Sequence, residues 1–106
     1  MIKDAILVFV TCPCAKEAGH IADSLLKKKL VACASVLPGI KSKFRWKGGI
    51  ETAKEILIMA KTLRSKFAAL EKEVRRCHSY EVPEIVALPI VSGSEKYLSW
   101  IAESLE

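Results

Sequence analysis

The first apolar segment of the chain, AILVFVT at residues 5–11, is unbroken and rich in branched and aromatic side chains. This pattern is typical of a central β-strand that is buried on both faces. Further along, apolar residues recur at intervals of three and four, at Ala18, Ile21, Ala22, Leu25 and Leu26. That spacing predicts an amphipathic helix, and the lysines at residues 27–29 suit the negative end of its dipole.

The middle of the chain predicts a long β-hairpin, because two long extended stretches flank the sequence KGGI at residues 47–50. The two glycines would supply the positive φ angles of a tight hairpin turn. In the first of these strands, basic residues alternate with apolar and small ones, so one face carries Lys41, Lys43, Arg45 and Lys47. The other face would then carry Ile40, Ser42, Phe44 and Trp46.

The last third of the chain predicts two helices separated by a strand. A helix over about residues 65–76 is marked by Phe67, Leu70 and Val74. The segment PEIVALPIV at residues 83–91 predicts a short strand punctuated by prolines. A third helix is expected in KYLSWIAESL, preceded by Ser92 and Glu95 at the spacing of a capping box. Its apolar stripe would bury Leu98, Trp100, Ile101 and Leu105.

The resulting order, βαββαβα, predicts an α+β fold of the ferredoxin-like type, a split βαβ sandwich with sheet order 4-1-3-2 and an added helix. The second strand would lie at the edge of the sheet. At roughly 15 residues it exceeds the usual five or six, and so long an edge exposes unpaired backbone groups. Oligomerisation through the hairpin is therefore expected, although the basic side chains would oppose pairing at that edge.

Composition narrows the class of protein. A chain of 106 residues with 51% apolar content makes one globular domain, residues 1–106. No apolar run approaches the roughly 18 residues of a membrane span, and no cleavable signal follows the charged start, so a cytoplasmic protein without membrane association is expected. The four cysteines are expected to be reduced thiols. The net charge of +5 favours anionic partners in general.

The basic strand raises the hypothesis of an RNA-binding module, because one common class binds RNA on a ferredoxin-like sheet. Such modules stack bases on aromatic residues of the central strands. Here Phe44 and Trp46 lie on the proposed edge strand and face away from the lysines. Nucleic acid is therefore an unlikely partner, and the basic face is expected to be solvated.

Stretches spread over nearly the whole chain resemble one family: LVACASVLPGIKSKFRWKGGIE, EILIMAKT, HSYEVPEIVALPI and YLSWI. In this order and spacing they resemble the CutA divalent-cation-tolerance proteins. Where members usually carry His-Pro-Tyr-Glu, this chain has His78-Ser79-Tyr80-Glu81. The resemblance implies a ferredoxin-like fold like that of PII-type signal proteins, a tightly packed homotrimer, a cytoplasmic role linked to copper tolerance, and no established catalytic reaction.

The segment CHSYEVPEI at residues 77–85 is the first candidate for a binding site. Val82 precedes a proline and is pushed towards an extended conformation, so the helix must end before it. Glu81 and Glu84 would then point to opposite sides, about 10 Å apart along the chain. The residues expected at a ligand-binding cleft between subunits are Lys61, Tyr80, Glu81, Glu84 and Trp46. The alternative is that the glutamates hold backbone amides or basic side chains while Tyr80 and Trp46 pack.

Lys61 ends the apolar strand EILIMAK, where a lysine needs a partner or a small anionic ligand. Cys33, within an apolar run, is expected to be a buried small side chain. His20 lies on the polar side of the first helix and is expected to be solvated.

Soft donors suggest a metal site, because thiolates with imidazole suit copper(I) or zinc. The first strand and the second helix run in the same direction, so their ends should lie at the same pole of the domain. The candidate ligands there are Cys12, Cys14, Cys77 and His78. No cofactor is expected to be obligatory, and copper or another divalent cation is the metal that the site would bind.

An enzyme is the remaining alternative, with Cys77 and His78, or Cys12 and a histidine, as nucleophile and base. Phosphate-binding loops, zinc-hydrolase spacings and serine nucleophile elbows are absent from the sequence. The leading hypothesis is therefore a non-enzymatic homotrimer that binds or signals in response to a metal. A small-ligand sensor, a thiol enzyme and a basic RNA-binding module are the alternatives.

Overall fold

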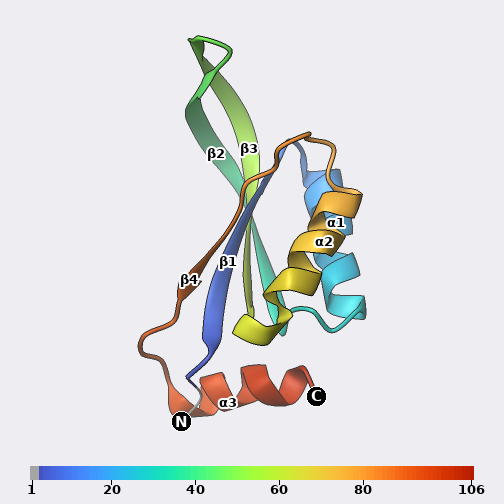
Figure 1. Ribbon diagram of the computed structural model, residues 1–106, viewed down its shortest axis with the longest axis vertical. Helices are drawn as coiled ribbons and strands as arrows, with labels where there is room; N and C mark the ends of the chain where they lie inside the picture. Colours follow the sequence, from blue (N-terminus) through green and yellow to red (C-terminus); the bar gives the residue numbers. More distant parts are fainter. Residues whose placement is uncertain (1–2) are drawn as a thin grey trace.

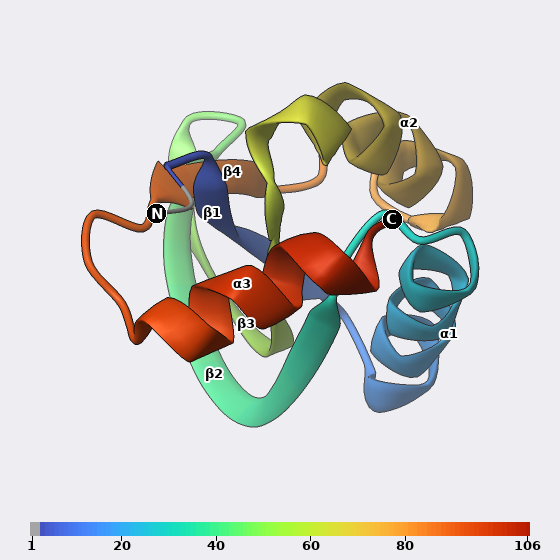
Figure 2. The same cartoon turned by 90° about the horizontal axis from the view of Figure 1, so that it is seen from below.

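The fold, described over residues 3–106 by a computed structural model, is a four-stranded antiparallel sheet with two helices on one face and a third across its lower end (Figures 1 and 2). The elements follow the predicted order: β1 (Ala5–Cys12), α1 (Ala15–Lys27), β2 (Cys33–Trp46), β3 (Gly49–Leu63), α2 (Phe67–Cys77), β4 (Ile85–Pro89) and α3 (Glu95–Ser104). The sheet order is β2-β3-β1-β4, so the ferredoxin-like topology and the edge position of β2 are confirmed. No helix in residues 3–106 has the length and apolar character needed to cross a bilayer.

The main core lies between the sheet and the pair α1 and α2. The β1 side chains on the helix side are buried and pack against the buried stripe of α1. On the other face Leu7 and Phe9 are only partly buried, so the predicted burial of this strand on both faces is incomplete. On α2, Leu70 and Val74 complete this core at zero exposure. Leu26, at the margin of the predicted α1 stripe, is instead 41% exposed.

A buried carboxylate ties α1 to α2. Glu73 of α2 is 6% exposed and accepts hydrogen bonds from Ser24 and from Lys28 Nζ of α1, the latter at 2.9 Å. It also accepts from Arg76 Nη2 at 2.6 Å. These bonds, of which the one from Arg76 has the largest effect, hold the pKa of Glu73 well below its usual range. The charge of Glu73 is thus compensated within the helical layer.

The hairpin β2–β3 projects beyond the helices and lengthens the molecule to 45 Å (Figure 1). Its turn differs from the predicted one. Lys47 (φ 48°) and Gly48 (φ 80°) take the positive φ angles, while Gly49 opens β3 opposite Trp46. The turn is therefore a two-residue loop in which one left-handed position is occupied by lysine rather than glycine, a conformation that costs an L-residue some strain.

A β-bulge interrupts β2 between Leu37 and Ile40. Leu37 pairs with Leu57 and Ile40 pairs with Glu55, so β2 uses one more residue than β3 over this interval. Gly39, within the bulge, has a φ of +83°, where glycine is favoured. Beyond the bulge, the even-numbered residues of β2 therefore lie on the face that the odd-numbered ones occupy before it.

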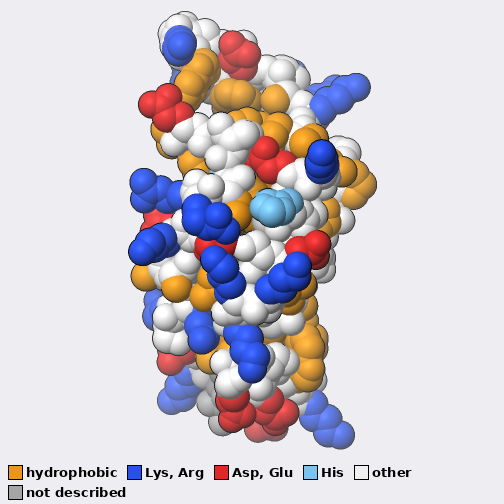
Figure 3. All heavy atoms as spheres, turned by 90° about the vertical axis from the view of Figure 1, so that its right-hand side faces the viewer, with side chains coloured by type: hydrophobic (Ala, Val, Ile, Leu, Met, Phe, Trp, Pro, Cys, Tyr) orange, Lys and Arg blue, Asp and Glu red, His pale blue; other side chains and the backbone are white. Residues whose placement is uncertain are grey.

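The sheet face away from α1 and α2, here called the open face, is largely apolar. Pairing places Phe9 beside Met59 and Val86, and Leu7 beside Leu88. Paired residues of antiparallel strands point to the same side. Val86 and Leu88 are 47% and 50% exposed. The side of the molecule that α1 and α2 form carries many Lys and Arg side chains instead (Figure 3).

The end of the chain departs from prediction in two details. Ser94, not Ser92, caps α3, and its hydroxyl accepts a hydrogen bond from Tyr97 N. Trp100 is 43% exposed beside Tyr97 and does not join the small core of α3. Leu98, Ile101 and Leu105 are buried there, as predicted. The strand β4 is also shorter than the predicted 83–91, because residues 83–84 and 90–91 lie outside its pairing with β1.

Candidate functional site

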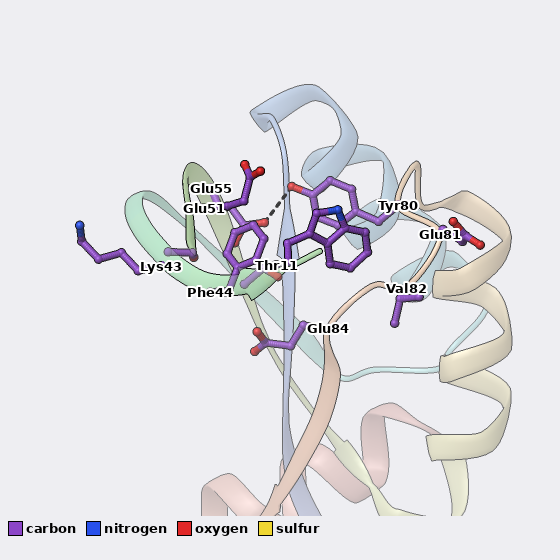
Figure 4. A pocket seen from close by; sticks show the side chains of 11 residues that line it. Thr11, Lys43, Phe44, Glu51, Glu55, Tyr80, Glu81, Val82 and Glu84 are labelled. Atoms are coloured by element: carbon purple, nitrogen blue, oxygen red, sulfur yellow. Dashed lines mark hydrogen bonds between the residues drawn. The ribbon is translucent and has the colours of Figure 1, made fainter. Parts of the chain in front are cut away.

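A pocket of about 500 Å³ lies between the hairpin and the segment that leads from α2 to β4 (Figure 4). It brings together four of the five residues predicted for a ligand cleft: Trp46, Tyr80, Glu81 and Glu84. The remaining lining residues are Thr11, Ser42, Lys43, Phe44, Glu51, Glu55 and Val82. Residues 80–84, from the last third of the chain, thus lie next to the hairpin, which comes from the middle of the sequence.

Glu55 and Tyr80 form the inner part of this pocket. The Tyr80 hydroxyl donates to Glu55 Oε2 at 2.8 Å, and Glu55 is 7% exposed. Burial, followed by this hydrogen bond, raises the pKa of Tyr80 to about 12. The phenol therefore stays protonated at neutral pH and keeps donating to the carboxylate.

The orientations of the other charged residues are visible in Figure 4. Glu84 lies on the side of Phe44, whereas the carboxylate of Glu81 points away from the other lining side chains. This agrees with the prediction that Glu81 and Glu84 face opposite ways. The amine of Lys43 also points away from the pocket. The interior is therefore acidic and aromatic.

His78 fixes the segment that carries Tyr80. Its Nε2 lies 2.7 Å from the carbonyl oxygen of Thr11 and donates to it. With the proton assigned to Nε2, Nδ1 accepts the backbone N–H of Tyr80 at 3.1 Å. Glu17 Oε2 lies 3.3 Å from the same Nδ1 and accepts the N–H of Ser79. The predicted meeting of the ends of β1 and α2 at one pole is thus confirmed by the His78–Thr11 contact.

The thiols at that pole are not gathered around one point. Burial, with nearby Glu17 and Glu55, raises the pKa of the Cys12 thiol to about 12. Cys14 is exposed, and the Cys77 thiol donates to Glu73 Oε2 at 3.5 Å. Within residues 3–106, no three His, Cys, Asp or Glu side chains are arranged to hold a metal ion.

Residues 6–104 match the model of the CutA1 divalent ion tolerance protein family. This chain belongs to that family. It is 46% identical over 99 residues to the divalent-cation tolerance protein CutA of Archaeoglobus fulgidus, covering 93% of this chain and 96% of that protein. It is 40% identical over 100 residues to the chloroplastic protein CutA of Arabidopsis thaliana, covering 94% of this chain. The chain spans 55% of the length of that plant relative.

Solved CutA structures have the same fold. The CutA of Xylella fastidiosa superposes with a TM-score of 0.94 at 36% identity, covering 97% of this chain and 99% of that one. The A. fulgidus protein, described as a periplasmic divalent cation tolerance protein, superposes with a TM-score of 0.93 at 44% identity, covering 96% and 99%. The relatives are named as tolerance proteins rather than enzymes, which agrees with the expected absence of catalysis without excluding it.

The family's link to divalent cations makes the fit of a metal a direct question for this chain. Metal ligation by His78 requires a free nitrogen lone pair, but Nδ1 already accepts the Tyr80 N–H. A Cys12 thiolate would have to form against a pKa of about 12. As arranged, these side chains do not fit a metal ion, and the four-residue site stays a prediction that needs their rearrangement.

The same geometry tests the alternative hypothesis that the protein is a thiol enzyme with a cysteine nucleophile and a histidine base. Productive activation needs a base within hydrogen-bond reach of the thiol. The partners of both His78 ring nitrogens are the Thr11 carbonyl and the Tyr80 amide. His20 is exposed on α1, as predicted. No Cys–His hydrogen bond is formed within the described part of the chain.

Lys61 and Cys33 lie outside the pocket. Lys61 Nζ donates to Ser35 Oγ at 3.4 Å, which supplies a polar partner without a ligand. Cys33 is partly exposed rather than buried, and its sulfur lies 3.4 Å from the Tyr97 hydroxyl. Among the pocket residues that the sequence did not reveal, Glu55 is the one that bonds to Tyr80. Its only local signal is a glutamate beside the apolar run ILIMA.

Proposed function

We propose that this protein acts in copper tolerance as a non-enzymatic homotrimer of the cytoplasm that binds a small ligand in the pocket, in the manner of PII-type signal proteins. The observation that carries the proposal is the pocket, because it combines aromatic walls, a buried carboxylate and a volume of about 500 Å³. Pockets of this size and mixed lining are typical of small-molecule sites. Family membership supplies the link to divalent cations.

The trimer is supported by the open face. Half-exposed Val86 and Leu88 extend an apolar surface formed with Leu7, Phe9 and Met59, and contiguous apolar surface of this kind marks protein–protein contacts. Pairing also places Glu55 on the same side of β3 as Leu57 and Met59. The pocket therefore borders the surface that assembly would cover, as expected for a cleft between subunits.

The assembly is tested by light scattering on dilute protein, which should report three times the 11.7-kDa chain mass. A double change, Val86→Glu with Leu88→Glu, should yield monomers, because burying two carboxylates at an apolar contact is costly. Ala69→Glu, on the exposed surface of α2, is the matched control and should remain trimeric. Wild-type protein that stays monomeric at micromolar concentration would disprove the trimer.

The role in tolerance is tested in cells that lack the gene. Growth under graded copper should be restored by the wild-type protein and by Glu103→Gln, a control on the exposed side of α3. The double variant Trp46→Ala with Glu55→Gln should fail, since it removes an aromatic wall and the buried charge of the pocket. Equal restoration by the pocket variant, at equal protein level, would show that the pocket has no part in tolerance.

A further inference from the structure

The pocket carries uncompensated negative charge. Its lining includes Glu51, Glu55, Glu81 and Glu84, of which Glu81 directs its carboxylate away from the other lining side chains (Figure 4). In residues 3–106 none of these carboxylates forms an ion pair; the ion pairs present involve Glu73 and Glu17. Lys43, the one basic lining residue, directs its amine outward (Figure 4).

Glu55 makes this imbalance costly. At 7% exposure it has left most of its hydration, and its side-chain partner is the neutral hydroxyl of Tyr80. Charged groups at such burial are normally paired with an opposite charge. A cation entering the pocket would supply the missing partner.

Aromatic rings stand at the same cavity. Phe44 and Trp46 are 41% and 47% exposed, and with Tyr80 they line it from two separate segments. Large aromatic side chains left half exposed around an acidic interior match the chemistry of cation–π recognition, in which tryptophan is the strongest partner.

We propose that this pocket binds an organic ammonium ion, with its charge balanced by the glutamates and its alkyl groups against Trp46 and Phe44. The inference rests on the proposed function, whose ligand class it names. A bare metal ion fits less well, because metal ligands must converge to about 2.0–2.6 Å from one point. Here the carboxylates are spread around a cavity of about 500 Å³, and no metal-holding group occurs within residues 3–106.

Choline and its neutral isostere 3,3-dimethyl-1-butanol are the probes, because they have the same shape and differ in charge. The chain has two tryptophans, so the Trp100→Phe variant makes Trp46 fluorescence a direct reporter. We expect a saturable emission change with choline that weakens as NaCl is raised, since salt screens the carboxylates. The isostere should produce no saturable change at matched concentration.

Two variants assign the charge. Glu55→Gln and Glu84→Gln, each in the Trp100→Phe background, should weaken choline binding by about threefold or more. Glu103→Gln removes one negative charge from α3 outside the pocket lining and should leave the affinity unchanged. Light scattering on the same samples reports the assembly independently.

The outcomes separate the two proposals. If the protein is a trimer and its Trp46 emission does not change with choline, the inference is overturned and the proposed assembly stands. This would happen if a neighbouring chain filled the pocket or if nothing bound there. Equal binding of choline and its isostere also overturns it, since charge would then play no part. A monomer that binds choline with the expected variant effects supports the inference while disproving the homotrimer.

Discussion

Two buried glutamates of similar exposure are treated differently by this fold. Glu73, between α1 and α2, is 6% exposed and is bonded by Ser24, Lys28 and Arg76. Glu55, on the hairpin, is 7% exposed and has the Tyr80 hydroxyl as its side-chain partner. The first carboxylate is saturated and joins helices, whereas the second retains the capacity to meet a ligand. Burial alone therefore does not distinguish structural from functional charge; the partners do.

The largest effect on stability is expected from Glu73→Gln. The substitution removes the charge that pairs with Lys28 and Arg76, and it leaves Ser24 and Cys77 with a weaker acceptor. Thermal unfolding should shift down by several degrees, while choline binding should be unchanged. A melting temperature equal to that of the wild type would show that the contacts of Glu73 contribute no net stability.

Acid should remove the same contribution from the wild-type protein. The folded pKa of Glu73 is depressed by Arg76, Lys28 and Ser24, so its stabilisation is present above the unfolded pKa of about 4.3. It is lost as pH falls through the folded value. The melting temperatures of wild type and Glu73→Gln should therefore converge below about pH 4. A constant difference down to pH 2 would contradict this assignment.

Tyr80→Phe should have a smaller effect. It removes the hydroxyl that donates to buried Glu55, and a hydrogen bond to a charged group contributes about 1.5–3 kcal/mol. Chemical denaturation should detect this loss near neutral pH. Because the folded pKa of Tyr80 is raised to about 12, the contribution is complete below about pH 10 and is lost as pH rises through 12. A difference in stability between the two proteins that does not shrink above about pH 10 would contradict the contact.

Glu55→Gln should change stability least, by less than about 1 kcal/mol. The glutamine oxygen can still accept from Tyr80, and the substitution removes a buried charge that has no counter-ion. This is the sharpest contrast with Glu73→Gln. Glu73→Gln should lower stability and leave choline binding unchanged, whereas Glu55→Gln should weaken choline binding and leave stability nearly unchanged. A large loss of stability in Glu55→Gln would assign Glu55 a structural role like that of Glu73.

Local patterns predicted most of the fold because they depend on neighbours in the sequence. The unbroken apolar run of β1 and the stripe containing Ile21 and Leu25 on α1 specify elements directly. The order of those elements then leaves few topologies. Details that depend on tertiary packing were missed, such as Trp100, whose place on an apolar stripe did not reveal that the core of α3 is too small to include it.

The site was partly predictable for the same reason. Tyr80, Glu81 and Glu84 lie close together in the sequence around Pro83, so they were found as a group. Glu55 joins them only through folding, 25 residues away from Tyr80. For the thiols, topology placed the ends of β1 and α2 together correctly. It did not determine where the side chains point. Cys12 is buried in the core, and the Cys77 thiol points towards Glu73.

The bulge at Pro38–Gly39 has a consequence for how this chain tolerates a change in length. Side chains alternate along a strand, so a change of one residue normally moves every later side chain to the opposite face. Here the bulge already holds one extra residue between Leu37 and Ile40. Deleting Gly39 would straighten β2 and leave Phe44 and Trp46 opposite the same residues of β3. The bulge would therefore allow β2 to lose one residue without changing which face its later side chains occupy, so the aromatic side chains would stay at the pocket.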